Sequence, residues 1–128
     1  MQLTENVTGI QHIGIPTNDI GKTAAFFESL GFEKAWEVHD ALRHVMFLRL
    51  KNIVIETYEN GQAALKPGAI DHISLDVADI EDAWRQVTAL GYEPLEGEIR
   101  ELPFWRNGVR FFTICGPEME KVEFNQYL

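Results

Sequence analysis

Apolar and polar residues follow the same order of patterns twice along this chain. Two short runs rich in β-branched residues, 8–15 and 70–77, predict strands. Each run ends in polar residues and is followed by apolar residues at helical spacing. This pattern predicts two amphipathic helices, which begin near Asp19 and near Asp79.

Glycines mark the end of both predicted helices, and three more strands are predicted after each of them. Gly31 and Gly91 follow the last apolar helical positions, where a left-handed C-terminal residue is common. Further strands are expected at 33–40, 43–50, 52–59, 92–99, 108–115 and 121–128. The segment 59–68 contains two glycines and a proline, which predicts a linker between the halves.

The two halves are also similar residue by residue. Residues 10–33 align with residues 70–93 without a gap, and this alignment pairs His12 with His72. The chain therefore carries one histidine at the same place in each copy.

A second match involves the last predicted strand of each half. Residues 52–60 resemble residues 121–127, and Glu56 corresponds to Glu123 in this comparison. More residues separate the helix end from the glutamate in the second half, and we expect the extra length in segment 100–108.

These patterns predict an α+β fold made of two tandem βαβββ modules within a single domain, 1–128. Module 1 covers about residues 7–60 and module 2 about residues 68–128.

Composition and charge exclude several classes of partner. The chain has 128 residues, of which 45% are hydrophobic, enough for a buried core. Its 11 basic and 20 acidic residues give a net charge of −9, which disfavours nucleic acid and anionic membranes. The apolar runs are too short to span a bilayer. The single cysteine, Cys115, and the absence of a secretory signal pattern predict a cytoplasmic location.

The two histidines and two glutamates are candidate metal ligands. Side chains alternate along a strand, so His12 and His72 should face the same way in their modules. Glu56 and Glu123 lie among apolar strand residues, where an unpaired carboxylate is costly and a bound cation would offset that cost. Two imidazoles and two carboxylates suit one divalent ion of nickel, cobalt, zinc, manganese or iron.

A simpler interpretation exists for each residue alone. A single histidine is usually a packed residue, and a single glutamate usually lies on an exposed edge. Their equivalence in both repeats favours the joint site. His39 and His44 have no repeat partners and are interpreted as structural, and Cys115 as a packing residue.

Several motifs of this chain resemble the vicinal oxygen chelate superfamily, and bacterial-type glyoxalase I (lactoylglutathione lyase) in particular. They are HIGI at 12–15, VIETY at 54–58, DHISLDVADIE at 71–81 and GPEMEKVEF at 116–124. The resemblance implies paired modules forming a cup-shaped mixed sheet around one metal ion, with the ligands His12, Glu56, His72 and Glu123.

The resemblance also implies a function, with alternatives. The implied activity is that of a metal-dependent lyase or isomerase acting on a small substrate with neighbouring oxygens through an enediolate, with Glu123 as the base and Glu56 as its symmetric partner. The alternatives are a drug- or metabolite-binding protein of the bleomycin-resistance type, an epimerase of the methylmalonyl-CoA type, and a fosfomycin-type transferase. Epimerases usually have glutamine at the place of Glu56. Pro16 stands where glutathione-using members have an arginine, so the resemblance does not extend to the thiol cofactor.

The segment 102–112 contains the candidate substrate residues. They are Phe104, Trp105, Arg106 and Arg110, with Arg49 and Arg100 as further candidates. A guanidinium binds a carboxylate or phosphate through two parallel hydrogen bonds, although a solvated surface role is common for arginine. We also expect a homodimer, with the metal site either within one chain or shared by two.

Overall fold

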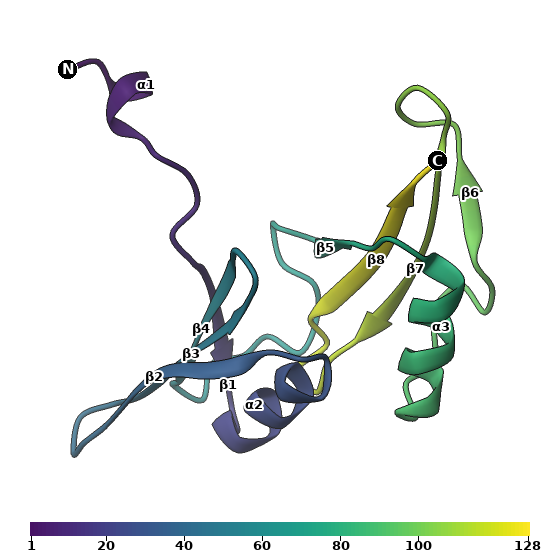
Figure 1. Cartoon of the computed structure of the whole chain (residues 1–128). Coiled ribbons are helices and arrows are strands. Elements are labelled where there is room, and N and C mark those ends of the chain that lie inside the picture. Colours follow the sequence, from purple (N-terminus) through teal and green to yellow (C-terminus); the bar gives the residue numbers. More distant parts are fainter. The chain divides into compact units, whose positions relative to one another are not determined.

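A four-stranded mixed sheet with one helix packed on it occurs twice in the chain (Figure 1). The computed structural model describes all residues, 1–128, and divides them into two units, Met1–Gln62 and Ala63–Leu128. Unit 1 contains α1 (Leu3–Asn6), β1 (Ile13–Thr17), α2 (Ile20–Ser29), β2 (Glu33–His39), β3 (His44–Leu50) and β4 (Ile53–Glu59). Unit 2 contains β5 (His72–Asp76), α3 (Ile80–Ala89), β6 (Arg100–Leu102), β7 (Val109–Cys115) and β8 (Lys121–Tyr127).

The strand order is the same in both sheets. It is β1-β4-β3-β2 in unit 1 and β5-β8-β7-β6 in unit 2. The first and last strands of each unit pair in parallel, and the other neighbours pair antiparallel. The predicted α+β class and the βαβββ order of both modules are confirmed.

Both predicted helices begin and end at the predicted residues. The carboxylates of Asp19 and Asp79 accept hydrogen bonds from the backbone N–H groups of Lys22 and Asp82, as N-caps do. Gly31 and Gly91 have φ angles of 101° and 97°, a region that favours glycine.

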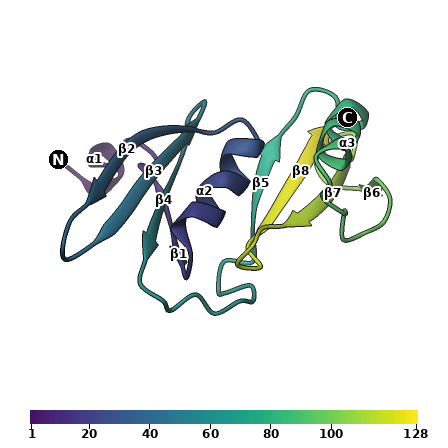
Figure 2. The ribbon, with the colours of Figure 1, turned by 90° about the horizontal axis from the view of Figure 1, so that it is seen from below.

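One face of each sheet is covered by its helix, and this is where the apolar core of each unit lies (Figure 2). In unit 1, Phe27 of α2 and Leu48 and Ile55 of the sheet are fully buried. In unit 2, Trp84 of α3 packs edge-on against Phe112 at 5.2 Å between ring centroids. The opposite face of each sheet is left free by the helix of that unit.

Segment 92–99 does not form the predicted strand. Pro94 lacks an N–H group, Gly97 has a φ of 73°, and the segment runs through turns. It still lies along β7, since the N–H of Leu95 donates to the carbonyl of Thr113 and the N–H of Thr113 donates to the Glu96 carboxylate. The edge strand forms later, as the short β6.

Other differences from the predictions are smaller. The first strands begin at Ile13 and His72, later than expected, and helix α1 was not predicted. The hairpin from Arg100 to Phe111 is longer than the equivalent hairpin from Val38 to Val45, so much of the extra length of the second half lies there. None of the helices has both the length and the apolar character needed to cross a membrane.

Candidate metal centre

His12 and Glu56 form a pair on the free face of the unit 1 sheet. His12 directly precedes β1, and the register pairs Gly14 of β1 with Glu56 of β4. Because side chains two positions apart share a face, His12 lies diagonally beside Glu56. The His12 Nε2 atom is 3.8 Å from Glu56 Oε2, and its Nδ1 atom is 2.9 Å from Gln11 Oε1.

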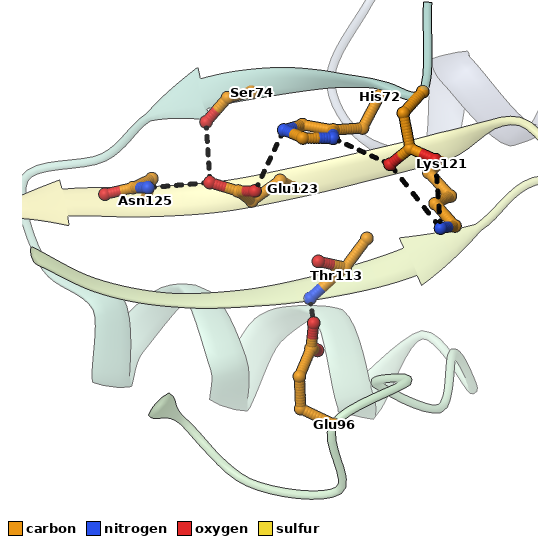
Figure 3. Close-up of polar contacts among 8 residues, drawn as sticks. His72, Ser74, Glu96, Thr113, Lys121, Glu123 and Asn125 are labelled. Carbon is orange, nitrogen blue, oxygen red and sulfur yellow. Dashed lines mark hydrogen bonds and ion pairs between the residues drawn. The ribbon is translucent and has the colours of Figure 1, made fainter. Parts of the chain in front are cut away.

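Unit 2 contains the same arrangement with shorter distances. The register pairs Ser74 of β5 with Glu123 of β8, and His72 is the first residue of β5. His72 Nε2 is 3.2 Å from Glu123 Oε2, and His72 Nδ1 is 2.9 Å from Asp71 Oδ2 (Figure 3). The side chains of Glu56 and Glu123 are only 26% and 13% exposed.

The hydrogen-bond partners of the two imidazoles determine which ring nitrogen is unprotonated and faces the glutamate. The Asp71 carboxylate and the Gln11 carbonyl oxygen can only accept hydrogen bonds, so each Nδ1 carries the proton that it donates. In the neutral ring, the lone pair of Nε2 then faces a carboxylate oxygen, 3.8 Å away in unit 1 and 3.2 Å away in unit 2, and the two lone pairs repel each other. A cation bound by both atoms removes the repulsion, and a hydrogen-bonded Nδ1 is the usual arrangement of a metal-ligating histidine. The donor atoms of both pairs therefore fit a divalent metal ion.

The two glutamates differ in how they are held. Glu123 Oε1 accepts hydrogen bonds from the Ser74 hydroxyl at 3.1 Å and from the Asn125 amide at 2.6 Å (Figure 3). In unit 1, Gly14 stands opposite Glu56 and has no side chain to donate, and the Tyr58 ring lies close to it. The carboxylate of Glu123 is thus oriented by two neutral donors that have no counterpart at Glu56.

Asp71 is itself held in place. Its carboxylate lies 3.3 Å from the Lys121 ammonium. The hydrogen bond from the His72 ring, together with that from Lys121, lowers the pKa of Asp71 below its usual value. Asp71 thus stays ionised and keeps the Nε2 atom of His72 directed at Glu123.

Each unit contributes two of the four predicted ligands. The structure brings them together as two pairs, and it contains no group of three His, Cys, Asp or Glu side chains placed to hold a metal ion. The joint site of His12, Glu56, His72 and Glu123 stays a prediction.

A cavity of about 490 Å³ adjoins the unit 2 pair. Its lining includes His72, Ser74, Glu123 and Asn125 from the sheet, and Phe104 and Trp105 from the loop after β6. The two aromatic residues selected from the sequence therefore lie next to the histidine and glutamate of this unit.

The arginines selected from the sequence lie elsewhere. Arg110 contacts Glu81 of α3 at 3.1 Å and Glu101 at 3.8 Å. Arg106 is exposed, and neither arginine lines the cavity. Arg100 is held near Glu96 and Glu98, and Arg49 is exposed on β3.

The other histidines and the cysteine have structural surroundings. His39 and His44 stack at 3.7 Å at the end of the β2–β3 hairpin, and His44 contacts Glu37 at 2.8 Å. Burial raises the pKa of the Cys115 thiol, which disfavours its nucleophilic form.

Four residues of the site were not selected from the sequence. They are Gln11, Asp71, Ser74 and Asn125. Gln11 and Asp71 occupy the same position in the repeat, directly before each histidine, which is a signal that the alignment contains. Ser74 and Asn125 have no such signal, because the first half carries Gly14 and Tyr58 at their places.

Comparison with known sequences places this chain among proteins of one superfamily. A sequence profile of the Glyoxalase/Bleomycin resistance protein/Dioxygenase superfamily matches residues 9–121. The uncharacterized protein YwbC of Bacillus subtilis is 28% identical over 127 residues, which cover 91% of this chain and 96% of that protein.

Solved structures share the fold at low sequence identity. A glyoxalase family protein from Enterococcus faecalis superposes with a TM-score of 0.77 at 22% identity, covering 92% of this chain and 97% of that chain. The fosfomycin resistance protein FosX from Listeria monocytogenes, crystallised with Mn(II) and sulfate, has a TM-score of 0.68 at 17% identity, covering 95% and 94%.

Proposed function

This chain belongs to the Glyoxalase/Bleomycin resistance protein/Dioxygenase superfamily, and we propose that it is a divalent-metal-dependent lyase or isomerase of the glyoxalase I kind, acting on a small substrate with two neighbouring oxygens. One observation carries the proposal. Each unit points a histidine Nε2 at a glutamate oxygen and holds the histidine Nδ1 on an accepting side chain.

The four side chains His12, Glu56, His72 and Glu123 would hold the ion. Nickel, cobalt, zinc, manganese and iron all accept two imidazoles and two carboxylates with positions left for substrate. The chemistry that such an ion supplies when bound is Lewis-acid polarisation of the substrate oxygens. FosX, a structural neighbour, was crystallised with Mn(II).

The residues of this chain supply the remaining steps. Glu123 lines the cavity and is the base that takes a proton from the carbon beside the polarised oxygen, then returns it to the neighbouring carbon or the opposite face. Ser74 and Asn125 orient this carboxylate, and Glu56 is its partner in the other half. Phe104 and Trp105 line one side of the cavity and position the substrate.

Metal binding is the first test. Titration of metal-stripped protein with Co(II), followed by visible absorption, should show one weakly absorbing, six-coordinate ion per chain. The variants His12→Ala and His72→Ala should each lose this ion, and His39→Ala, a histidine outside both pairs, should keep it. Retention of the same spectrum in both His12→Ala and His72→Ala would overturn the joint site.

Turnover tests the role of Glu123. Loaded protein should exchange the α-proton of vicinal-oxygen substrates or isomerise dicarbonyl–thiol adducts, detected by NMR in D₂O. Glu123→Gln should lower this rate by a factor on the order of 10² or more, because it removes the base and keeps the shape. Glu56→Gln is the matched comparison, and an unchanged rate in Glu123→Gln would contradict the assignment.

We also propose that the protein acts as a homodimer in the cytoplasm. A second function, sequestration of a ligand without chemistry, is favoured by the aromatic cavity alone. Tight ligand binding by protein that binds no Co(II) and shows no proton exchange would identify that function.

A further inference from the structure

The cavity of unit 2 is built by alternation along its strands. On β5, His72, Ser74 and Asp76 point to the cavity, and the intervening Leu75 is buried on the helix side. On β8, Glu123 and Tyr127 line the cavity, whereas the alternate residues of that strand face the core. The cavity therefore covers the free face of this sheet, opposite α3.

Alternation also decides which side chains of β7 reach the cavity. Phe111 lines it, and its neighbour Arg110 points to the other face, where it contacts Glu81 of α3. The only basic residue of β8 within the sheet register, Lys121, contacts Asp71. The lining thus contains no lysine and no arginine.

The loop after β6 adds aromatic walls at some conformational cost. Phe104 and Trp105 are 54% and 76% exposed, although burial would favour them. Trp105 has a φ of 61°, an uncommon conformation for a bulky residue. The Trp105 ring packs edge-on against Tyr127 at 5.8 Å.

Hydrogen bonds to the C-terminal residue hold the loop in this conformation. The Leu128 N–H donates to the Gly108 carbonyl, and the Asn107 amide donates to the Leu128 carbonyl at 3.2 Å. The loop is therefore anchored to the end of β8 and presents its aromatic rings beside the cavity.

Apart from the histidine His72, the charged side chains of the lining are carboxylates. Asp76 and Glu123 supply carboxylates, and the net charge of the whole chain is −9. Aromatic faces attract cations through their negative quadrupole. An anionic group entering the cavity would lose hydration without meeting a lysine or an arginine, which is unfavourable.

We propose that this cavity selects its ligand by charge: the part of the substrate that lies beyond the reacting oxygens is a flat ring that is cationic or neutral, and it carries no carboxylate, phosphate or phosphonate. The rings of Phe104, Trp105, Phe111 and Tyr127 supply the aromatic contacts to this ring, and Asp76 faces its positive substituent. The inference rests on the proposed function only in taking the His72–Glu123 pair as the reacting end of the cavity.

The test compares three naphthalene probes of similar size on metal-free protein. They are 2-naphthylmethylammonium, 2-naphthylmethanol and 2-naphthoate, and none of them chelates a metal. Binding is followed by the indole N–H signals of the three tryptophans in ¹H–¹⁵N NMR spectra, assigned with Trp105→Phe. Only the Trp105 signal should shift, with Trp84 on α3 and Trp36 in unit 1 as internal controls. The dissociation constant of the ammonium probe should be at least about fivefold lower than that of the naphthoate.

Two variants sharpen the comparison. Asp76→Asn, a change at an exposed strand position, should reduce the preference for the cation, and Arg110→Ala should leave the order of the probes unchanged. Equal or tighter binding of the naphthoate, or no shift of the Trp105 signal with any probe, would overturn the inference. Because the probes do not need the metal, a failed Co(II) titration would remove the proposed function and leave this result standing.

Discussion

Glu123 and Glu56 occupy equivalent positions, but only Glu123 is held by neighbouring hydrogen-bond donors. Ser74 and Asn125 bind its Oε1 atom, which leaves Oε2 directed at His72. Losing such partners of a ligand typically lowers metal affinity by about 10- to 100-fold.

We therefore expect Ser74→Ala to weaken Co(II) binding by about tenfold, because the Glu123 carboxylate loses one of its two orienting bonds. The measurement is the absorption titration of metal-stripped protein. Ser29→Ala, which removes a serine at the end of α2 in the other unit, should not change the affinity. Equal affinities in Ser74→Ala and the unchanged protein would show that Asn125 alone suffices to orient the carboxylate.

The histidine and glutamate of each pair could be predicted from the sequence. The side chains that orient Glu123 could not. His12, His72, Glu56 and Glu123 repeat, and repetition is visible in a sequence. Ser74 acts through a strand register that pairs it with Glu123, 49 positions away, and a register of this kind cannot be read from local pattern. Asn125 lies two positions after Glu123 on the same strand, but the first half carries Tyr58 at its place, so the repeat gives no signal for it.

At the scale of helices and strands, the N-caps are equivalent in both units. Asp79→Ala should lower the free energy of unfolding by about 1 kcal/mol, because the N–H of Asp82 loses its acceptor at the start of α3. Asp79→Asn retains an acceptor and should cost much less. Urea denaturation of the three proteins measures the difference, and equal losses in both variants would contradict a capping role.

The turn between β7 and β8 makes stability depend on pH. Burial raises the pKa of Glu120 above its usual 4.5, and one of its carboxylate oxygens is buried without a hydrogen-bond partner. Between the unfolded pKa and the raised folded pKa, the native state binds more protons than the unfolded state. The unfolding free energy contributed by this group therefore falls as the pH rises through that window.

Glu120→Gln should remove this dependence, because the amide does not ionise. The melting temperature of the variant minus that of the unchanged protein should be larger at pH 7 than at pH 4. Thermal unfolding at both values measures the effect, with Glu98→Gln, an exposed carboxylate, as the control. A difference between variant and unchanged protein that is the same at both pH values would contradict the burial of a charge at Glu120.

The apolar and polar pattern of the sequence predicted most helices and strands. The predicted strand 92–99 does not form, for a physical reason. The helices and their caps depend on local residues, so Asp19 and Gly31 were recognisable. Segment 92–99 has strand-like residues, but Pro94 and Gly97 keep it out of the ladder, and it is held against β7 by isolated bonds.

At the scale of the whole molecule, the proposed metal site can take its four proposed ligands from one chain or from two. We expect a homodimer, with a mass about twice the 14.6 kDa of one chain in sedimentation analysis. The sequence pattern and the strand register determine the fold of each unit. They do not determine which two units supply one proposed metal site.

Mixing two inactive variants answers this question. His12→Ala and His72→Ala each destroy one ligand, so dimers of a single variant should bind no Co(II). If each site is shared by two chains, mixed dimers contain one intact site, and refolding the variants together should restore up to about half of the binding in those dimers. If each site lies within one chain, mixing restores none. A mixture of Glu56→Ala and His12→Ala is the control, since both changes affect the same half and no intact site forms.

The division of the proposed ligands between two self-contained sheets also has an evolutionary consequence. A duplicated gene that carries half of a site in each copy is free to change one half while the other keeps its fold and its chemistry. Gly14 and Ser74, at the same place in the two copies, differ in this way. Under the proposed function, loss of a single histidine in one copy would end metal binding and spare the aromatic cavity in the other, so a catalyst and a carrier of the same ligand would lie one mutation apart.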